Sequence, residues 1–320
     1  MKKTTKTWLI LAASLVFIGC ALFAGVMSTL GWNFSKLSTV QYETNTYEIR
    51  DTFDSISMNT DTADIVFIFS ADGKCKVECY EEENAKHSVA VKNGTLTVEL
   101  LDERRLSDLV GLRFDSPKIT VYLPKTEYTS LLIREDTGDV KIPKDFTFRD
   151  VDLSLSTGDV TFYASASGKI QIKTSTGDIL ATNLSAHALD LSVSTGKITV
   201  SGVICQGDIT IGVSTGKANL TDIRCKSLIS RGDTGDISLN NVIATEKFSI
   251  QRSTGDIKFI RSDAPEIFVE TDTGDVTGTL LAGKVFLTQT DTGNVDVPKT
   301  TTGGRCEIIT DTGNIRIKIV

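Results

Sequence analysis

The chain has 320 residues, 40% of them apolar, so it is long enough for one large domain or two ordinary ones. Its net charge is −7, and discounting Lys2, Lys3 and Lys6 leaves −10 for the remainder, which argues against nucleic acid and anionic lipid headgroups as partners. Six cysteines are too few for a disulfide scaffold, and none falls in a paired Cys-x-x-Cys metal motif.

Residues 8–32 carry no charge and are predicted to form a transmembrane anchor. As a helix at ~1.5 Å per residue the stretch spans ~38 Å, enough to cross the ~30 Å hydrocarbon core of a bilayer. The only two tryptophans, Trp8 and Trp32, stand at its ends, where an indole ring suits the headgroup layer. Residues 1–7 contain three lysines, so we predict a basic cytoplasmic tail and an extracellular body after the anchor.

Two alternative interpretations of this stretch stay open. A cleaved secretory signal is the first, although such signals have a shorter apolar core that ends in small residues. The second is lipid modification at Cys20, because Phe17-Ile18-Gly19-Cys20 approximates a lipoprotein motif, although Phe17 departs from it and the apolar run continues past the cysteine. In all three interpretations the rest of the chain is exported across the membrane.

Residues 33–50 are polar and are predicted to be a stalk, followed by an irregular segment over residues 51–130. Within this segment Ala63 takes the glycine place in a degenerate copy of a motif that recurs further along the chain. Asn93-Gly94 lies between alternating apolar residues and is a strong hairpin signal. We therefore predict the first coils of a repeat fold with an inserted hairpin and loop that cover its membrane-side end.

From residue 131 to residue 320 one short motif recurs every 19 or 20 residues. Ser156-Thr157-Gly158-Asp159-Val160 is one copy, and Asp can replace the Ser. A fixed period this short is typical of a solenoid, in which each repeat is stable only against its neighbours. The glycines of the motif, which we predict to form structural turns, are Gly138, Gly158, Gly177, Gly196, Gly216, Gly235, Gly255, Gly274, Gly293 and Gly313.

Each repeat is predicted to hold two short β-strands. Apolar residues lie seven and five residues before the glycine, as Val151 and Leu153 do, and two and four residues after it, as Val160 and Phe162 do. The alternation changes phase at Thr-Gly, where glycine tolerates a positive φ and the Ser or Asp two residues earlier is expected to accept a backbone hydrogen bond.

We therefore predict an all-β fold, a parallel β-solenoid of about 11 or more coils of 19–20 residues, with the regular coils over residues 131–320. Ten coils stacked ~4.8 Å apart would make a rod on the order of 48 Å long. The hand of the solenoid and its number of faces stay open.

This array behind an N-terminal apolar stretch resembles the bacterial "putative adhesin" β-strand-repeat family, a domain of unknown function frequent in Gram-positive bacteria. The resemblance covers roughly residues 50–320. It implies a surface-exposed, membrane-tethered β-repeat domain of the cell envelope, sometimes linked to envelope-stress operons, and it implies no catalytic residues.

Motifs that could carry catalysis are better explained by the repeat. Asp-Thr-Gly is the tripeptide of aspartic-protease active sites, but the repeats exchange its Asp freely for Ser, which a catalytic carboxylate would not permit. The two histidines, His87 and His187, fall near no metal or triad spacing. Residues 101–118 are charged and are the one segment where a catalytic site could hide. We predict no enzymatic activity and no cofactor.

Acidic residues around the turns offer one candidate metal site. Oxygen ligands of the kind that calcium prefers recur at Asp272, Asp275, Asp291 and Asp311. Lys197 and Lys217 interrupt the column of acidic residues that follow the glycines, which indicates relief of repulsion between stacked carboxylates. We predict no bound metal, with calcium as the weaker alternative.

Cys205 and Cys225 each lie nine residues after a glycine in adjacent coils, so we expect them to be stacked neighbours. A disulfide between them and a pair of buried thiols both fit this placement.

These features predict a non-enzymatic, membrane-anchored, extracytoplasmic binding or scaffold module of the cell envelope. Its expected partners are a protein or a cell-wall glycan. The final predicted strand holds Ile315, Ile317, Ile319 and Val320 and has no polar cap, so we also expect self-association through the C-terminal coil. The alternatives are a carbohydrate-binding or carbohydrate-active β-helix and an accessory subunit of a membrane sensor.

Overall fold

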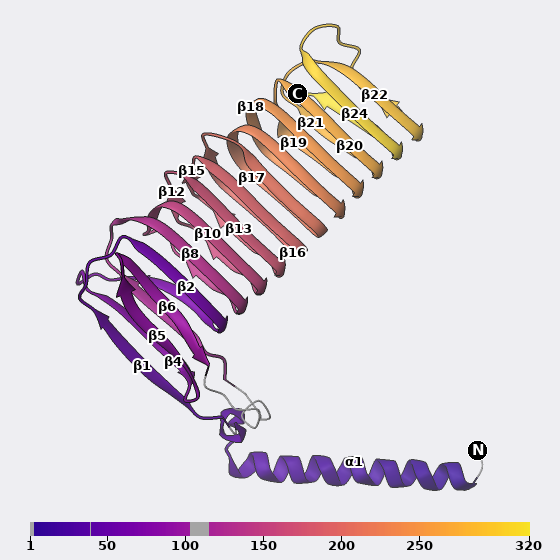
Figure 1. The fold of residues 1–320 in the computed structure, drawn as a ribbon. Coiled ribbons are helices and arrows are strands. Elements are labelled where there is room, and N and C mark those ends of the chain that lie inside the picture. Colours follow the sequence, from indigo (N-terminus) through magenta and orange to yellow (C-terminus); the bar gives the residue numbers. More distant parts are fainter. Residues whose placement is uncertain (1–2, 39, 103–114) are drawn as a thin grey trace.

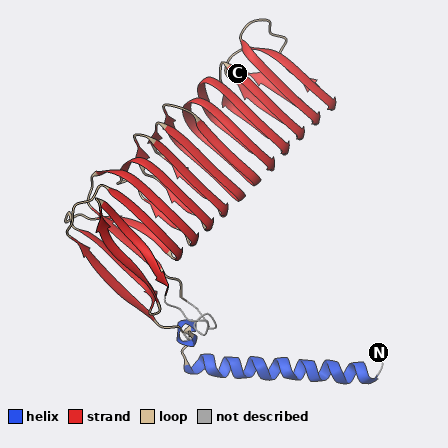
Figure 2. Ribbon diagram, viewed as in Figure 1, coloured by secondary structure: helices blue, strands red, loops and turns tan. Residues whose placement is uncertain are grey.

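The computed structural model describes residues 3–38, 40–102 and 115–320 (Figure 1). Its body is a parallel β-solenoid of about ten turns, which confirms the predicted fold class. Figure 2 shows strands throughout this body and a long helix only at the N-terminal end. Of the charged segment 101–118, the one place where a catalytic site could hide, residues 103–114 lie outside the described residues.

The helix α1 (Lys3–Thr29) is followed by a 3-10 turn, η1 (Phe34–Leu37). From Thr5 to Thr29 it is long and apolar enough to cross a membrane, and its most apolar window of 18 residues is exposed, although Met27 near its C-terminal end is buried. The anchor was predicted to end at residue 32, but Gly31 and Trp32 both take a positive φ, so the helix stops before them.

A cap with five strands among the described residues covers the N-terminal end of the solenoid. It consists of β1 (Tyr42–Ile49), β4 (Cys75–Glu82), β5 (Ala85–Lys92), β6 (Thr95–Asp102) and β7 (Lys118–Leu123). β6 and β7 pair in parallel with the two strands of the first coil. β5 pairs antiparallel with β6, and β4 lies antiparallel between β7 and β1.

The structure confirms the hairpin at Asn93-Gly94 and corrects the predicted stalk. Asn93 and Gly94 have φ values of 51° and 75°, as a tight two-residue turn between β5 and β6 requires. Part of the segment 33–50 is not a stalk, because all eight residues of β1 pair with β4. Alternating Tyr47 and Ile49, half-buried against the core, were the missed strand signal.

The coils stack in register, with a longer strand before most motif glycines and a shorter one after most of them. The first coil starts at the repeat that contains Ala63, as predicted, because β2 (Ser55–Thr62) pairs in parallel with β8 (Glu127–Thr137). In chain order the solenoid strands are β2 (Ser55–Thr62), β3 (Asp64–Phe69), β8 (Glu127–Thr137), β9 (Val140–Ile142), β10 (Thr147–Thr157), β11 (Val160–Phe162), β12 (Ser165–Ala166), β13 (Lys169–Thr176), β14 (Ile179–Thr182), β15 (Ser185–Ala186), β16 (Ala188–Cys205), β17 (Ile209–Thr234), β18 (Ile237–Thr254), β19 (Ile257–Ser262), β20 (Glu266–Thr273), β21 (Val276–Leu280), β22 (Lys284–Thr292), β23 (Val295–Asp296), β24 (Gly304–Thr312) and β25 (Ile315–Ile319).

The core is the column of apolar side chains that point into the coils. Val151, Leu153, Val160 and Phe162, the four positions expected to be apolar in one repeat, are all at most 2% exposed. Parallel pairing places Val151 beside the equivalent residues of both neighbouring coils. Each coil therefore buries its apolar face only against its neighbours, as the repeat predicts.

The C-terminal end departs from chain order, which corrects the expectation that the last strand is the open one. β24 pairs with both β20 and β22, and β25 pairs with both β21 and β23. The last coil in the chain is therefore stacked between the coil of β20 and β21 and the coil of β22 and β23 (Figure 1). The open end of the solenoid is therefore β22 with β23.

Candidate functional site

The glycine of each motif stands where two coils approach most closely. Gly216 has a φ of 139°, and a Cβ built on it would overlap the carbonyl oxygen of Gly196 in the neighbouring coil. The same overlap with a neighbouring carbonyl occurs at every other motif glycine. The motif glycine is thus required by both the turn and the stacking of the backbone.

The residue after the glycine forms a hydrogen-bonded ladder along the solenoid. Asp139 Oδ1 accepts the backbone N–H of Asp159 at 2.8 Å, and Asp159 Oδ1 accepts that of Asp178 at 2.7 Å. The expectation had placed such backbone bonds on the Ser or Asp before the glycine, whereas Ser156 Oγ bonds to the Asp136 carboxylate. The acidic column is therefore structural, because each carboxylate satisfies a backbone donor of the next coil.

The two lysines that interrupt this ladder pair with its acids. Lys197 Nζ lies 3.6 Å from an oxygen of Asp178, and Lys217 Nζ lies 3.0 Å from one of Asp236. The Lys217 ammonium holds the pKa of the Asp236 carboxyl below its ordinary value. These contacts fit the expected relief of repulsion in the middle of the rod.

The four aspartates of the calcium alternative lie at the exposed turns of the last three coils. Because those coils are permuted, Asp311 stands between Asp272 and Asp291, and Asp275 faces Asn314. Asp275 Oδ1 accepts the backbone N–H of Asn314 at 2.7 Å, so Asp275 belongs to the same hydrogen-bonded ladder as Asp139 and Asp159. Among the described residues these aspartates do not bring three ligand atoms within 4.8 Å of one another.

A shallow groove crosses the outer face of the middle coils. Its volume is about 470 Å³. Two rows of outward-pointing residues line it, one four residues before each motif glycine and one two residues before. This serine groove is lined by Ser154, Leu155, Lys173, Thr174, Ser175, Ser192, Val193, Ser194, Gly212, Val213, Ser214, Arg231, Gly232 and Asp233.

The groove exists because two consecutive coils carry small residues where their neighbours carry long cations. Ser192 pairs with Lys173 on one side and with Gly212 on the other. Lys173 and Arg231 are exposed and stand three coils apart, which is ~14 Å at the parallel-strand spacing. Hydroxyl groups therefore line the groove between these two cations, and Asp233 lines it beside Arg231.

The sequence motifs considered above, including the interruptions of the acidic column, did not predict this groove. The signal was present in the neighbouring column, four residues before the glycines, where Arg134, Ser154, Lys173, Ser192, Gly212 and Arg231 follow one another. Ser192 and Gly212 are small and stand between Lys173 and Arg231 in this column, so they leave space between the two cations.

The paired cysteines lie as expected on adjacent coils. Cys205 pairs in register with Ala186, Cys225 with Ala244, and both are 4% exposed. The structure holds both as free thiols, and Cys205 Sγ donates to the backbone carbonyl of His187 at 3.3 Å. Burial raises the pKa of the Cys225 thiol to about 12, so the thiol is unreactive at neutral pH. The disulfide stays a prediction.

Comparison with known proteins identifies the family of the chain. The Toastrack family of unknown function (DUF4097) matches residues 53–214 and again residues 205–320. The chain belongs to the Toastrack family. The two matches together span the whole solenoid, and no curated protein matches the chain.

Two solved structures are similar to this Toastrack chain. A "putative lipid binding protein" from Parabacteroides distasonis is 19% identical, covers 75% of this chain and 98% of its own, and superposes with a TM-score of 0.52. A "putative adhesin" from Bacteroides fragilis is 17% identical and covers 87% of this chain and 97% of its own, with a TM-score of 0.42. At these identities the first of them supports the fold of this Toastrack chain and nothing finer.

Proposed function

We propose that this Toastrack chain is a non-enzymatic, membrane-anchored module of the cell envelope that binds a glycan chain in the serine groove. The groove is the observation that carries the proposal. Serine hydroxyls line it, and two cations, Lys173 and Arg231, lie along it three coils apart. Hydroxyl-rich grooves with fixed cations suit a polysaccharide that carries carboxylates or phosphates, because each cation can pair with one anionic sugar.

The anchor supports an extracytoplasmic location for this groove. α1 contains one stretch that could span a membrane, with the three lysines of the predicted cytoplasmic tail at its N-terminal side. On intact cells freed of their wall, added protease should therefore digest the solenoid. Protection of the solenoid would overturn the proposed topology.

Binding is tested with the full chain in nanodiscs against polygalacturonate and its carboxyl-reduced, uncharged counterpart. We expect binding of the anionic polymer only, and a loss of roughly tenfold in affinity in the double variant Lys173→Ala, Arg231→Ala. Lys258→Ala is the matched control, since Lys258 is equally exposed but lies outside the groove. Equal binding of the double variant and the control would refute the groove as the site.

The same samples separate the proposal from a carbohydrate-active enzyme. The new reducing ends released from the polymer are counted after prolonged incubation. A bound polymer that keeps its length supports a binding module, whereas time-dependent cleavage by the wild-type chain would make it an enzyme.

A further inference from the structure

We propose that Cys79, Glu81 and His87 form a site for a zinc-like transition-metal ion inside the N-terminal cap. Cys79 and Glu81 lie two residues apart on β4 and so point to the same side of the strand. His87 lies on β5. One ligand atom from each residue lies within 4.8 Å of the other two, and only this group does so among the residues that the structure describes.

All three side chains are withdrawn from solvent. Cys79 and Glu81 are 0% exposed and His87 is 3% exposed. Glu81 Oε2 lies 2.6 Å from His87 Nδ1 and accepts the backbone N–H of His87 at 2.7 Å. Glu81 Oε1 accepts an N–H of Asn45 at 2.8 Å, which holds the carboxylate in place. The three side chains are thus held close together, and an ion bound by both Glu81 Oε2 and His87 Nδ1 would replace the hydrogen bond between them.

The surroundings of His87 Nε2 also point to a ligand. This nitrogen is buried and has no hydrogen-bond partner among the described residues. A buried polar atom without a partner costs stability, and such atoms are rare unless a ligand satisfies them. Here the orphaned nitrogen belongs to the same imidazole that already contacts a buried carboxylate and lies close to a buried thiol.

The donor set selects the class of metal. One thiolate, one imidazole and one carboxylate suit zinc and its neighbours, whereas calcium and magnesium prefer oxygen ligands alone. Zinc would displace the Cys79 thiol proton, which passes to solvent. A fourth position can be filled from a pocket of about 280 Å³ that His87 lines together with Tyr42, Glu82 and Leu100.

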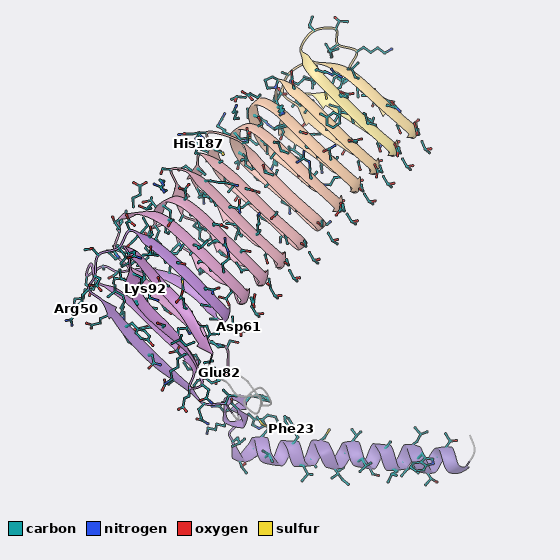
Figure 3. The ribbon with its side chains drawn as sticks, viewed as in Figure 1. Phe23, Arg50, Asp61, Glu82, Lys92 and His187 are labelled. Atoms are coloured by element: carbon teal, nitrogen blue, oxygen red, sulfur yellow. The ribbon has the colours of Figure 1, made fainter. Side chains whose placement is uncertain are left out.

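The site also meets a structural need of the cap. β4 and β5 share only one paired position, Glu82 with Ala85, so few backbone bonds join these neighbouring strands. A metal bound by Cys79 and Glu81 from β4 and by His87 from β5 would join the strands through side chains. The other histidine, His187, lies far from the cap, midway along the solenoid (Figure 3).

The test is a Co²⁺ titration of the full chain, stripped of metal by a chelator in detergent. We expect one Co²⁺ per chain, with the absorption band of a sulfur–cobalt bond, and full displacement of the cobalt by Zn²⁺. Cys79→Ser should remove the band and weaken Zn²⁺ binding at least about tenfold. Cys225→Ser is the control and should keep both, since Cys225 is equally buried but lies outside the cluster.

Three results would overturn the metal site: no stoichiometric Co²⁺ binding, binding without a sulfur–cobalt band, or a band that survives Cys79→Ser. The first two are read from the wild-type chain and do not require a variant to fold. If Cys79→Ser fails to fold, His87→Gln replaces it, and binding to that variant with wild-type affinity would equally refute the site.

Discussion

At the scale of single residues, Gly216 is held by two independent constraints. Its φ of 139° lies in a region that other residues rarely adopt, and an added Cβ would overlap the carbonyl oxygen of Gly196. We therefore expect Gly216→Ala to destabilise the fold by about 2–4 kcal/mol, since backbone strain and a backbone clash add. The measurement is the midpoint of urea unfolding of the full chain.

Gly212, in the same coil, is the matched control for this substitution. A Cβ built on Gly212 meets nothing closer than Ser192 Cβ at 3.4 Å, an ordinary contact. Gly212→Ala should therefore shift the urea midpoint little. Equal losses at Gly216 and Gly212 would mean that the stacking of coils does not require the motif glycine.

Glu135 makes the stability of the first coils depend on pH. Burial raises the pKa of its carboxyl to about 8, with Asp61 and Asp136 adding to the shift. The pKa of Glu135 is higher in the folded state than in the unfolded state, so its protonated carboxyl adds to the free energy of unfolding. This contribution is complete below about pH 4.5 and is lost as the pH rises through 8. We expect Glu135→Gln to be more stable than the wild type at pH 9. Between pH 4 and pH 9 the free energy of unfolding of the variant should rise relative to that of the wild type by roughly 2–5 kcal/mol.

The comparison is made from urea midpoints of both proteins between pH 4 and pH 9. Glutamine keeps the acceptor for the backbone N–H of Ala63, which Glu135 Oε1 binds at 3.1 Å. The wild-type curve should therefore fall below the variant curve above pH 5, and two parallel curves would show that Glu135 is not the titrating group.

At the scale of elements, the aspartate ladder joins one turn to the next. Asp159 Oδ1 accepts the backbone N–H of Asp178, so Asp159→Ala leaves that donor to water and should cost about 1 kcal/mol. Asp159→Asn should cost far less, because Asn314 Oδ1 accepts the N–H of Asn294 in the same way. Thermal melting of both variants measures the difference, and equal losses would contradict the hydrogen-bond account.

Much of the regular solenoid was predictable, because its signal repeats in every coil. Alternation around each glycine placed Val151, Leu153, Val160 and Phe162 in the core, where the structure has them. The cap strand β1 was missed because a single occurrence of a half-apolar strand has no copies to support it.

The order of the last coils could not be read from periodicity, since β22 and β24 both carry a complete motif. Composition does indicate the order. Ile308 on β24 is fully buried, whereas Thr288, which pairs with it on β22, is half-buried. The more polar coil lies at the open end, where part of its inner face meets water.

The candidate sites were less predictable than the fold because each depends on neighbours that the chain order does not show. The serine groove needs Ser192 and Gly212 to stack between two cations. The metal cluster needs β4 and β5 to bring His87 onto Glu81 inside an irregular cap. In the sequence, His87 had no neighbour at metal spacing.

At the scale of the whole molecule, the solenoid has one covered end and one open end. The cap closes the N-terminal end, next to α1 (Figure 1). At the other end β22 pairs only with β24, so one edge of its backbone lies unpaired among the described residues, beside the half-buried Phe286 and the exposed Val295. A second copy can offer only the same end, so self-association would form a two-fold dimer.

We expect the full chain in detergent to form a dimer as its concentration rises, and Thr288→Lys to prevent it. Thr288 lies half-buried on β22, and an inward-pointing charge on an edge strand blocks the addition of another strand. Thr199→Lys is the control, since Thr199 is also half-buried but lies on β16, paired on both sides. Sedimentation equilibrium distinguishes the outcomes: a monomeric wild type at high concentration would count against pairing through β22, and a dimer that survives Thr288→Lys would place the contact elsewhere.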